Sequence, residues 1–290
     1  MFRYCFEIAG ITIALHMDRK ITVSERFLPF QRTKFSACDY EVIFHQVREL
    51  PDLPEQWLRQ EQAFDVGRDA QGNYFRRFRD MRYDNRIYAA AFYDWKRRCV
   101  DVKYLSCGEN NLNQTDNCFF HIAWETILQL ENCMILHACG IDTAYGGILF
   151  SGRSGIGKST QGELWRRYEG AVIVNGDRPL IKKEEAVWYA YGAPYAGSSR
   201  CHLDMRTPIR AVVMLKQDTQ CRVRKLKPDE AFRSIYKGMT ISTWNSECIR
   251  NSCDLAQSLA LEIPVFELTC TPDWRAVELL KKTLRMEECV

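Results

Sequence analysis

The alternation of apolar and polar residues predicts a β-rich region in the first part of the chain. Most of the apolar or alternating stretches lie near Gly, Pro, Asp or Asn, which are typical of turns. The predicted strands cover residues 2–8, 11–15, 40–47, 74–79, 86–93 and 99–105. Residues 50–72, with Pro51 and Pro54, are interpreted as a connector with a helical turn or two at residues 55–60.

Helical periodicity first appears at residues 116–131, which Thr115 or Asp116 can cap. Its apolar residues fall on one face: Phe120, Ala123, Trp124, Ile127 and Leu128. We expect this helix to join a β-rich N-terminal domain, residues 1–115, to a second domain, residues 116–290.

In the second domain, predicted strands and helices follow one another, which is typical of an α/β fold. Strands are expected at residues 134–137, 148–150, 171–174, 187–191, 209–215, 221–226 and 265–269, with a turn at 140–145. Helices are expected at residues 160–168, 228–237, 244–260 and 272–286. Pro228 and Pro272 suit first helical positions, and Gly238 suits a helix end.

Composition restricts the class of protein. The chain has 290 residues, of which 46% are hydrophobic and 27% charged, as in globular proteins. A net charge of +3 gives no argument for nucleic-acid binding. The 13 cysteines form no C-x-x-C and no zinc-type cluster, so we expect reduced thiols. No apolar run approaches the roughly 20 residues that span a membrane, and we expect a cytoplasmic protein that binds no membrane.

Arginines and lysines gather beside aromatic residues between positions 74 and 98. They are Arg76, Arg77, Arg79, Arg82, Arg86, Lys96, Arg97 and Arg98, beside Tyr74, Phe75, Phe78, Tyr83 and Tyr88. One interpretation is a docking face for an acidic peptide or another anion. The other is the solvated face of an antiparallel sheet, which the nearly balanced net charge favours.

The residues from Gly152 to Ser159 spell G-x-x-x-x-G-K-[ST] after the apolar run 148–150, and a helix follows. Glycines allow positive φ and a close approach of backbone N–H groups to an anion. Lys158 is then expected to reach the β- and γ-phosphates of ATP, and Ser159 to ligate Mg²⁺. The predicted nucleotide-binding residues are Gly152, Ser154, Gly155, Ile156, Gly157, Lys158, Ser159 and Thr160.

Asp177 follows the predicted strand 171–174 in the sequence Asn175-Gly176-Asp177. An acidic residue at this place can hold Mg²⁺ or take a proton from the attacking hydroxyl. The alternative is an aspartate that only stabilises a turn.

From about His137 to its C-terminus the chain resembles the HPr kinase/phosphorylase-like kinases, which share their core with phosphoenolpyruvate carboxykinases. The features that carry the resemblance are residues 136–138, the loop ending at Ser159, the strand ending at Asp177, the stretch 192–198, and residues 264–268 with 271–273. It covers roughly half of the chain. It implies a P-loop kinase core after a small β-rich domain.

The resemblance also implies transfer of phosphate from ATP, with Mg²⁺, to a hydroxyl, typically of serine. By match to the family motifs, Lys158 and Ser159 take the nucleotide and metal positions and Asp177 the acidic catalytic position. His137 matches the histidine before the loop, with a core histidine as the alternative.

Two departures accompany the resemblance. Family members often have two consecutive aspartates after this strand, and Gly176 replaces the first. Asp177 alone must then act as base or metal partner, or ATP binds without efficient transfer. The stretch associated with dephosphorylation has no clear counterpart, so reversal by phosphate is not predicted.

Cationic and turn residues near these positions are candidates for contact with substrate or phosphate, although surface arginines are common. These candidates are Arg178, Tyr195, Gly197, Ser198, Arg200 and His202, and Arg206 is a further cation that could neutralise transition-state charge.

The sequence therefore predicts a kinase whose acceptor is a peptide or protein serine first, and free serine or another small alcohol second. The alternative is a catalytically weak nucleotide-binding module that recognises a partner peptide. A transport-type ATPase subunit is disfavoured because no L-S-G-G-Q follows the loop. The acceptor's identity and the oligomeric state stay open.

Overall fold

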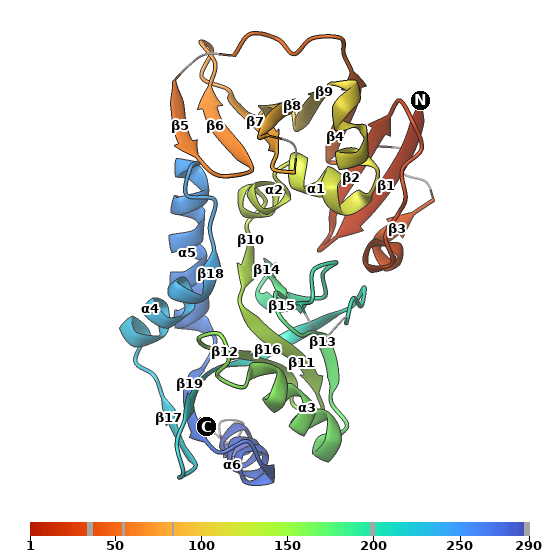
Figure 1. Ribbon diagram of the computed structural model, residues 1–290. Helices are drawn as coiled ribbons and strands as arrows, with labels where there is room; N and C mark the ends of the chain where they lie inside the picture. The colour runs from red at the N-terminus through yellow and green to blue at the C-terminus, as the bar shows by residue number, and fades with distance from the viewer. Residues whose placement is uncertain (34–36, 54–55, 83, 198–200, 287–290) are drawn as a thin grey trace. The chain divides into compact units, whose positions relative to one another are not determined.

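The computed structural model in Figure 1 describes residues 1–33, 37–53, 56–82, 84–197 and 201–286. The chain divides into two compact units, residues 1–124 (unit 1) and 125–290 (unit 2). Each is built on a large mixed β-sheet, so the chain is a mixed α/β protein.

Unit 1 is a nine-stranded sheet in the order β3-β1-β2-β4-β9-β8-β7-β6-β5. The strands β2, β4 and β9 run parallel, and the other pairs are antiparallel. The bounds are β1 Phe2–Ile8, β2 Ile11–Met17, β3 Gln31–Arg32, β4 Tyr40–Gln46, β5 Trp57–Gln60, β6 Phe64–Arg68, β7 Tyr74–Asp80, β8 Arg86–Asp94 and β9 Cys99–Tyr104. The helices are η1 Glu25–Phe30, η2 Ser106–Leu112 and α1 Thr115–His121.

The expected helix at residues 116–131 is wrong in one respect, since it is broken. Helix α1 ends at His121, and α2 covers Trp124–Leu130. Ala123 between them has a φ of 55°, in the left-handed region, which ends a right-handed helix.

The expected helical turn at residues 55–60 is also wrong. Strand β5 pairs there with β6, which the sequence analysis placed inside the connector. The ring of Trp57 packs 5.5 Å from that of Phe75 on β7, an aromatic contact between residues distant in sequence. Glu55 lies outside the described residues.

Neither interpretation of the arginine-rich segment describes Arg76, Arg77 and Arg79. Arg76 is 4% exposed, and its guanidinium lies 3.8 Å from the ring centroid of Phe64. Asp65 is fully buried and accepts hydrogen bonds from Arg77, at 2.7 Å, and from Arg79. These arginines have partners within unit 1, although the side chains of Arg77 and Arg79 remain 24% and 19% exposed.

The other cationic residues of that segment are exposed to solvent. Arg82 pairs with Asp80, and Arg98 lies 3.6 Å from Asp39. Lys96 and Arg97 are exposed. Tyr83 lies outside the described residues.

Unit 2 contains a ten-stranded sheet with the path β13-β11-β12-β16-β15-β14-β10-β18, and β19 joins β16 to β17. The strands are β10 Cys133–Leu136, β11 Ala138–Thr143, β12 Gly146–Ser151, β13 Val172–Asn175, β14 Leu180–Glu184, β15 Val187–Tyr191, β16 Arg206–Gln217, β17 Arg222–Lys225, β18 Met239–Thr240 and β19 Val265–Cys270. The helices that follow α2 are α3 Lys158–Glu169, α4 Pro228–Gly238, α5 Ser246–Glu262 and α6 Trp274–Met286.

The expected turn at residues 140–145 is confirmed only at residues 144–145, because strand β11 occupies residues 138–143. A Cβ at Gly140 would lie 3.2 Å from the Leu149 side chain and 3.4 Å from Pro179. Gly140 therefore serves close packing within a strand rather than a turn.

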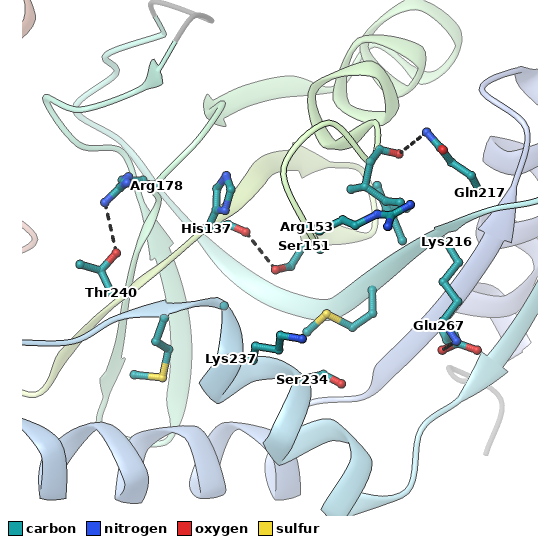
Figure 2. A pocket seen from close by; sticks show the side chains of 16 residues that line it. His137, Ser151, Arg153, Arg178, Lys216, Gln217, Ser234, Lys237, Thr240 and Glu267 are labelled. Carbon is teal, nitrogen blue, oxygen red and sulfur yellow. Dashed lines mark hydrogen bonds and ion pairs between the residues drawn. The ribbon is translucent and has the colours of Figure 1, made fainter. Parts of the chain in front are cut away.

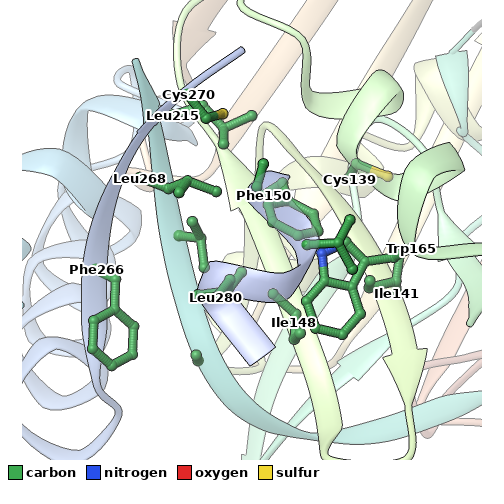
Figure 3. Close-up of a cluster of buried hydrophobic side chains, with 14 of the residues drawn as sticks. Cys139, Ile141, Ile148, Phe150, Trp165, Leu215, Phe266, Leu268, Cys270 and Leu280 are labelled. Atoms are coloured by element: carbon green, nitrogen blue, oxygen red, sulfur yellow. The ribbon is translucent and has the colours of Figure 1, made fainter. Parts of the chain in front are cut away.

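Helices cover both faces of the sheet around β12 and β16. On one face Ile148 and Phe150 pack with Trp165 of α3 and Leu280 of α6, as Figure 3 shows. On the other face Leu149 packs in a cluster with residues of α4 and α5. Strand β12 is therefore buried on both faces, which explains its continuous apolar run.

Every cysteine in the described part of the chain is a free thiol, as the scattered cysteine positions suggested. Among the helices of the described residues, none has the length and apolar character needed to cross a membrane.

Candidate functional site

The glycine-rich loop connects the end of β12 to the start of α3 through backbone that only glycine adopts easily. The φ angles are 146° at Gly152, 74° at Gly155 and 107° at Gly157. A Cβ at Gly155 or Gly157 would meet nothing within 4 Å. The backbone conformation, rather than a lack of space, therefore demands glycine at these two positions.

Lys158 is the first residue of α3 and is only 7% exposed. Its ammonium donates hydrogen bonds to the carbonyl oxygens of Gly152, at 3.2 Å, and Arg153, at 3.3 Å. Burial lowers the pKa of Lys158, and the charge of Asp177 acts in the opposite direction. The lysine thus places a positive charge at the centre of the loop.

The other loop residues divide by exposure. Ser154, Ser159 and Thr160 are exposed, so both hydroxyls at the start of α3 are accessible. Ile156 is buried, and its carbonyl oxygen accepts a hydrogen bond from Gln217 at 3.4 Å. That bond ties the loop to the end of the neighbouring parallel strand β16.

His137 lies between β10 and β11, beside Asp177. Its backbone N–H donates to Gly238 at 2.8 Å, and its carbonyl oxygen accepts from the Ser151 hydroxyl at 2.9 Å. Its Nε2 lies 3.4 Å from Oδ1 of Asp177. Burial, and then the charge of Lys158, lower the pKa of His137, whereas Asp177 raises it. The structure therefore brings His137, Asp177 and Lys158 within one another's electrostatic influence.

Asn175 is a residue of this site that the sequence analysis did not single out. It is fully buried at the end of β13. Its Oδ1 accepts from the backbone N–H groups of Asp177, at 3.0 Å, and Arg178, at 2.7 Å. Its Nδ2 donates to the carbonyl oxygens of Ala193, at 3.4 Å, and Tyr195, at 3.0 Å. Asn175 thus joins the Asp177 turn to the 192–197 stretch, and an Asn-Gly pair at a strand end was the sequence feature that could have shown it.

The 192–197 stretch packs directly on Asp177. Gly197 has a φ of 56°, and a Cβ there would lie 2.7 Å from the Cβ of Asp177. The half-buried Tyr195 belongs to the same stretch.

The remaining sequence candidates are Ser198, Arg200, His202 and Arg206. Ser198 and Arg200 lie outside the described residues. Arg206 pairs with Glu184 and lies 3.1 Å from the Tyr191 hydroxyl. His202 is half-buried and does not line the cavity beside the loop.

A cavity of about 810 Å³ adjoins the loop. Figure 2 shows the side chains around it, which come from the loop, β16, β19, α4 and β18. It is lined by His137, Ser151, Gly152, Arg153, Ile156, Arg178, Met214, Leu215, Lys216, Gln217, Ser234, Lys237, Gly238, Met239, Thr240 and Glu267. Lys158 and Asp177 do not line it, but each contacts residues that do.

The donor groups fit Mg²⁺ held jointly with phosphate. Ser159 offers an exposed hydroxyl, and the Asp177 side chain is 32% exposed. Within the described ranges no three His, Cys, Asp or Glu side chains form a group that could hold a metal ion. Mg²⁺ commonly uses one or two protein carboxylates together with substrate phosphates and water.

No family model and no curated protein matches this chain. Among solved structures it is similar to the Hpr(Ser) kinase/phosphatase from Coxiella burnetii, at 15% sequence identity and a TM-score of 0.31. The match covers 53% of this chain and 89% of that one. Any relationship is distant at most, so the chemistry of the site has to be assigned from its own residues.

Proposed function

We propose that the chain is a kinase that uses ATP and Mg²⁺ to phosphorylate a hydroxyl. A serine of a peptide or protein is the first acceptor, and free serine or another small alcohol the second. The observation that carries this is the position of His137 and Asp177 beside a glycine-rich loop that holds Lys158.

The loop and Lys158 bind and polarise the donor phosphates. Backbone N–H groups at the start of a helix attract anions, and the glycine conformations let the backbone approach closely. Lys158 adds a positive charge where negative charge gathers during transfer.

Asp177 activates the acceptor. The acceptor oxygen forms a bond to the γ-phosphorus, the bond from that phosphorus to the ADP oxygen breaks, and the hydroxyl proton passes to the Asp177 carboxylate. Because its pKa is lowered, His137 is neutral near pH 7 and can donate Nε2–H to Asp177. It then orients the carboxylate without neutralising it.

Mg²⁺, when bound, would neutralise phosphate charge, and Ser159 is the residue that fits it best. Gly176 provides no second carboxylate, so Asp177 must serve as base or metal partner. This is also the observation that favours the second candidate function, a nucleotide-binding module with little transfer.

The experiment compares Lys158→Ala and Asp177→Asn with the unchanged chain, using ATP binding and ATP consumption with serine-bearing acceptors. Lys158→Ala should weaken both. Asp177→Asn should keep ATP binding but lose turnover by about 10²–10⁴-fold, the usual contribution of a general base. Lys282→Ala, at an exposed lysine on α6 that does not line the cavity, is the matched control.

Unchanged nucleotide affinity in Lys158→Ala would show that the loop assignment is wrong. If the unchanged chain binds ATP but consumes none with any acceptor, the binding module replaces the kinase.

A further inference from the structure

The cavity beside the loop has more positive than negative side chains. Among the described residues, its lining includes Arg153, Arg178, Lys216 and Lys237 but a single carboxylate, Glu267. Glu267 lies 2.7 Å from the Lys216 ammonium and also pairs, at 3.3 Å, with Arg224. Its charge is therefore already balanced, and it does not offset the other cations.

Among these cations, Arg153 and Lys237 have the fewest polar contacts within the described part of the chain. Arg153 belongs to the loop, and Lys237 to the last turn of α4. Within the part of the chain that the structure describes, neither side chain forms an ion pair or a hydrogen bond, and both are exposed. Figure 2 shows Lys237 on the helix and Arg153 on the loop, with the cavity between their elements.

Arg178 connects this positive region to the reacting end of the site. Its Nε lies 3.5 Å from Oδ2 of Asp177, and its Nη1 donates to the Thr240 hydroxyl at 3.2 Å. His137, which contacts the same carboxylate, also lines the cavity. A group that occupies the cavity can therefore present a hydroxyl close to Asp177.

We propose that the cavity holds the acceptor and selects one that carries a carboxylate near its hydroxyl, paired with Lys237 and Arg178. This inference rests on the proposed function and names its substrate class. The carboxylate has two sources, an acidic residue beside a serine in a peptide or the α-carboxylate of a free hydroxy amino acid. Substituting Lys237 tests the proposal more directly than substituting Arg178, since Lys237 lies across the cavity from the phosphate-binding loop.

The test measures phosphorylation by the full chain of two serine peptides that differ only in Glu or Gln next to the serine. A second arm compares free serine with serine amide. We expect the acidic member of one pair to have a kcat/KM about tenfold higher than its neutral partner. Lys237 and Arg178 are partly exposed, and each should increase this preference by about two- to fivefold. The arm that shows the preference identifies the source of the carboxylate.

Lys237→Gln should reduce that preference by about two- to fivefold, by raising the KM for the acidic acceptor while the KM for ATP stays the same. Lys237→Arg should retain most of the preference because it keeps the charge. Lys282→Gln is the matched control and should change neither constant. Higher salt should weaken the preference in the unchanged chain, since it screens exposed charges.

Equal rates for both members of both pairs would overturn the proposal while leaving the kinase function intact. A Lys237→Gln variant with a raised KM for ATP alone would also overturn it, because the cavity would then serve the nucleotide. If no acceptor is phosphorylated, the proposed function fails. Direct binding of each Glu and Gln peptide and of serine and serine amide to the chain loaded with a non-hydrolysable ATP analogue then decides the carboxylate preference.

Discussion

Cationic side chains gather in both units, but they have opposite surroundings. In unit 1 the guanidinium of Arg76 lies among aromatic rings, and Arg77 and Arg79 share the buried Asp65. In unit 2 the described contacts leave Arg153 and Lys237 at the cavity without an ion pair. The first group stabilises the fold, whereas the second is available for a ligand.

The difference shows that a run of cations in a sequence does not by itself identify a binding face. Strand pairing places Asp65 directly opposite Arg77, which satisfies the arginines from within the chain. Around the cavity, Glu267 is the one carboxylate that the described lining contains, and it pairs with Lys216 and Arg224. The number of internal partners, rather than the number of cations, separates the two groups.

The largest expected effect would come from Asp65→Asn, which removes the charge that holds Arg77 and Arg79. Breaking a buried ion pair by changing one partner typically costs about 3–5 kcal/mol, because a charge is left without compensation. Denaturant unfolding of unit 1 should show this loss. Asp94→Asn, at an exposed carboxylate 3.7 Å from Arg97, is the control and should cost less than about 1 kcal/mol. Equal losses in the two variants would show that the arginines do not depend on Asp65.

The next effect concerns unit 2, where the buried amide of Asn175 holds the Asp177 turn through hydrogen bonds. Asn175→Asp keeps one acceptor oxygen but turns a second oxygen toward the carbonyls of Ala193 and Tyr195. Losing two buried hydrogen bonds should cost about 2–4 kcal/mol, and transfer should slow because Asp177 shifts. Unfolding of unit 2 measures the loss of stability, and kcat measures the slower transfer. Asn251→Asp, which loses a single bond to Gln129, should be milder, and a harmless Asn175→Asp would contradict this role.

The smallest effect is pH dependence within unit 1, beside the buried Arg76. Burial lowers the pKa of His121 to about 3, and its ring lies between the Tyr88 hydroxyl and the Asn117 carbonyl. Below about pH 6.5 the unfolded chain binds a proton that the folded chain excludes. Between pH 6.5 and pH 5 the free energy of unfolding should therefore fall by about 2 kcal/mol in total, at about 1.4 kcal/mol per pH unit.

Unfolding measured between pH 7 and pH 5 checks this slope. His121→Gln should flatten it, and His45→Gln, at an exposed histidine, is the control. If the pH dependence persists in His121→Gln, it comes from other titratable groups.

The elements that the sequence predicted well are those whose pattern is local. Strands such as β4 and β9 alternate, and α4 begins with Pro228 and ends at Gly238. The elements that were missed contain or follow residues that are typical of turns. β5 and β6 pair with neighbours after a connector rich in proline, and β11 contains Gly140, whose small size serves contacts with Leu149 and Pro179.

The candidate site divides in the same way. The residues of the glycine-rich loop are consecutive in the sequence, so its need for glycine could be predicted directly. The structure shows positive φ angles at Gly152, Gly155 and Gly157. The roles of Asn175 and Gly197 could not, since they arise where the strand end at residue 175 meets the stretch at 192–197. The cavity could not be foreseen either, because it is formed by segments from His137 to Glu267.

Strand β16 belongs to both parts of the sheet in unit 2. Its first residues pair with β15, and its later residues lie between β12 and β19. The strand that leads into the glycine-rich loop and the β14–β15 hairpin therefore share one hydrogen-bonded partner. Detachment of β16 would expose backbone groups in both parts of the sheet, so we expect the two parts to unfold together.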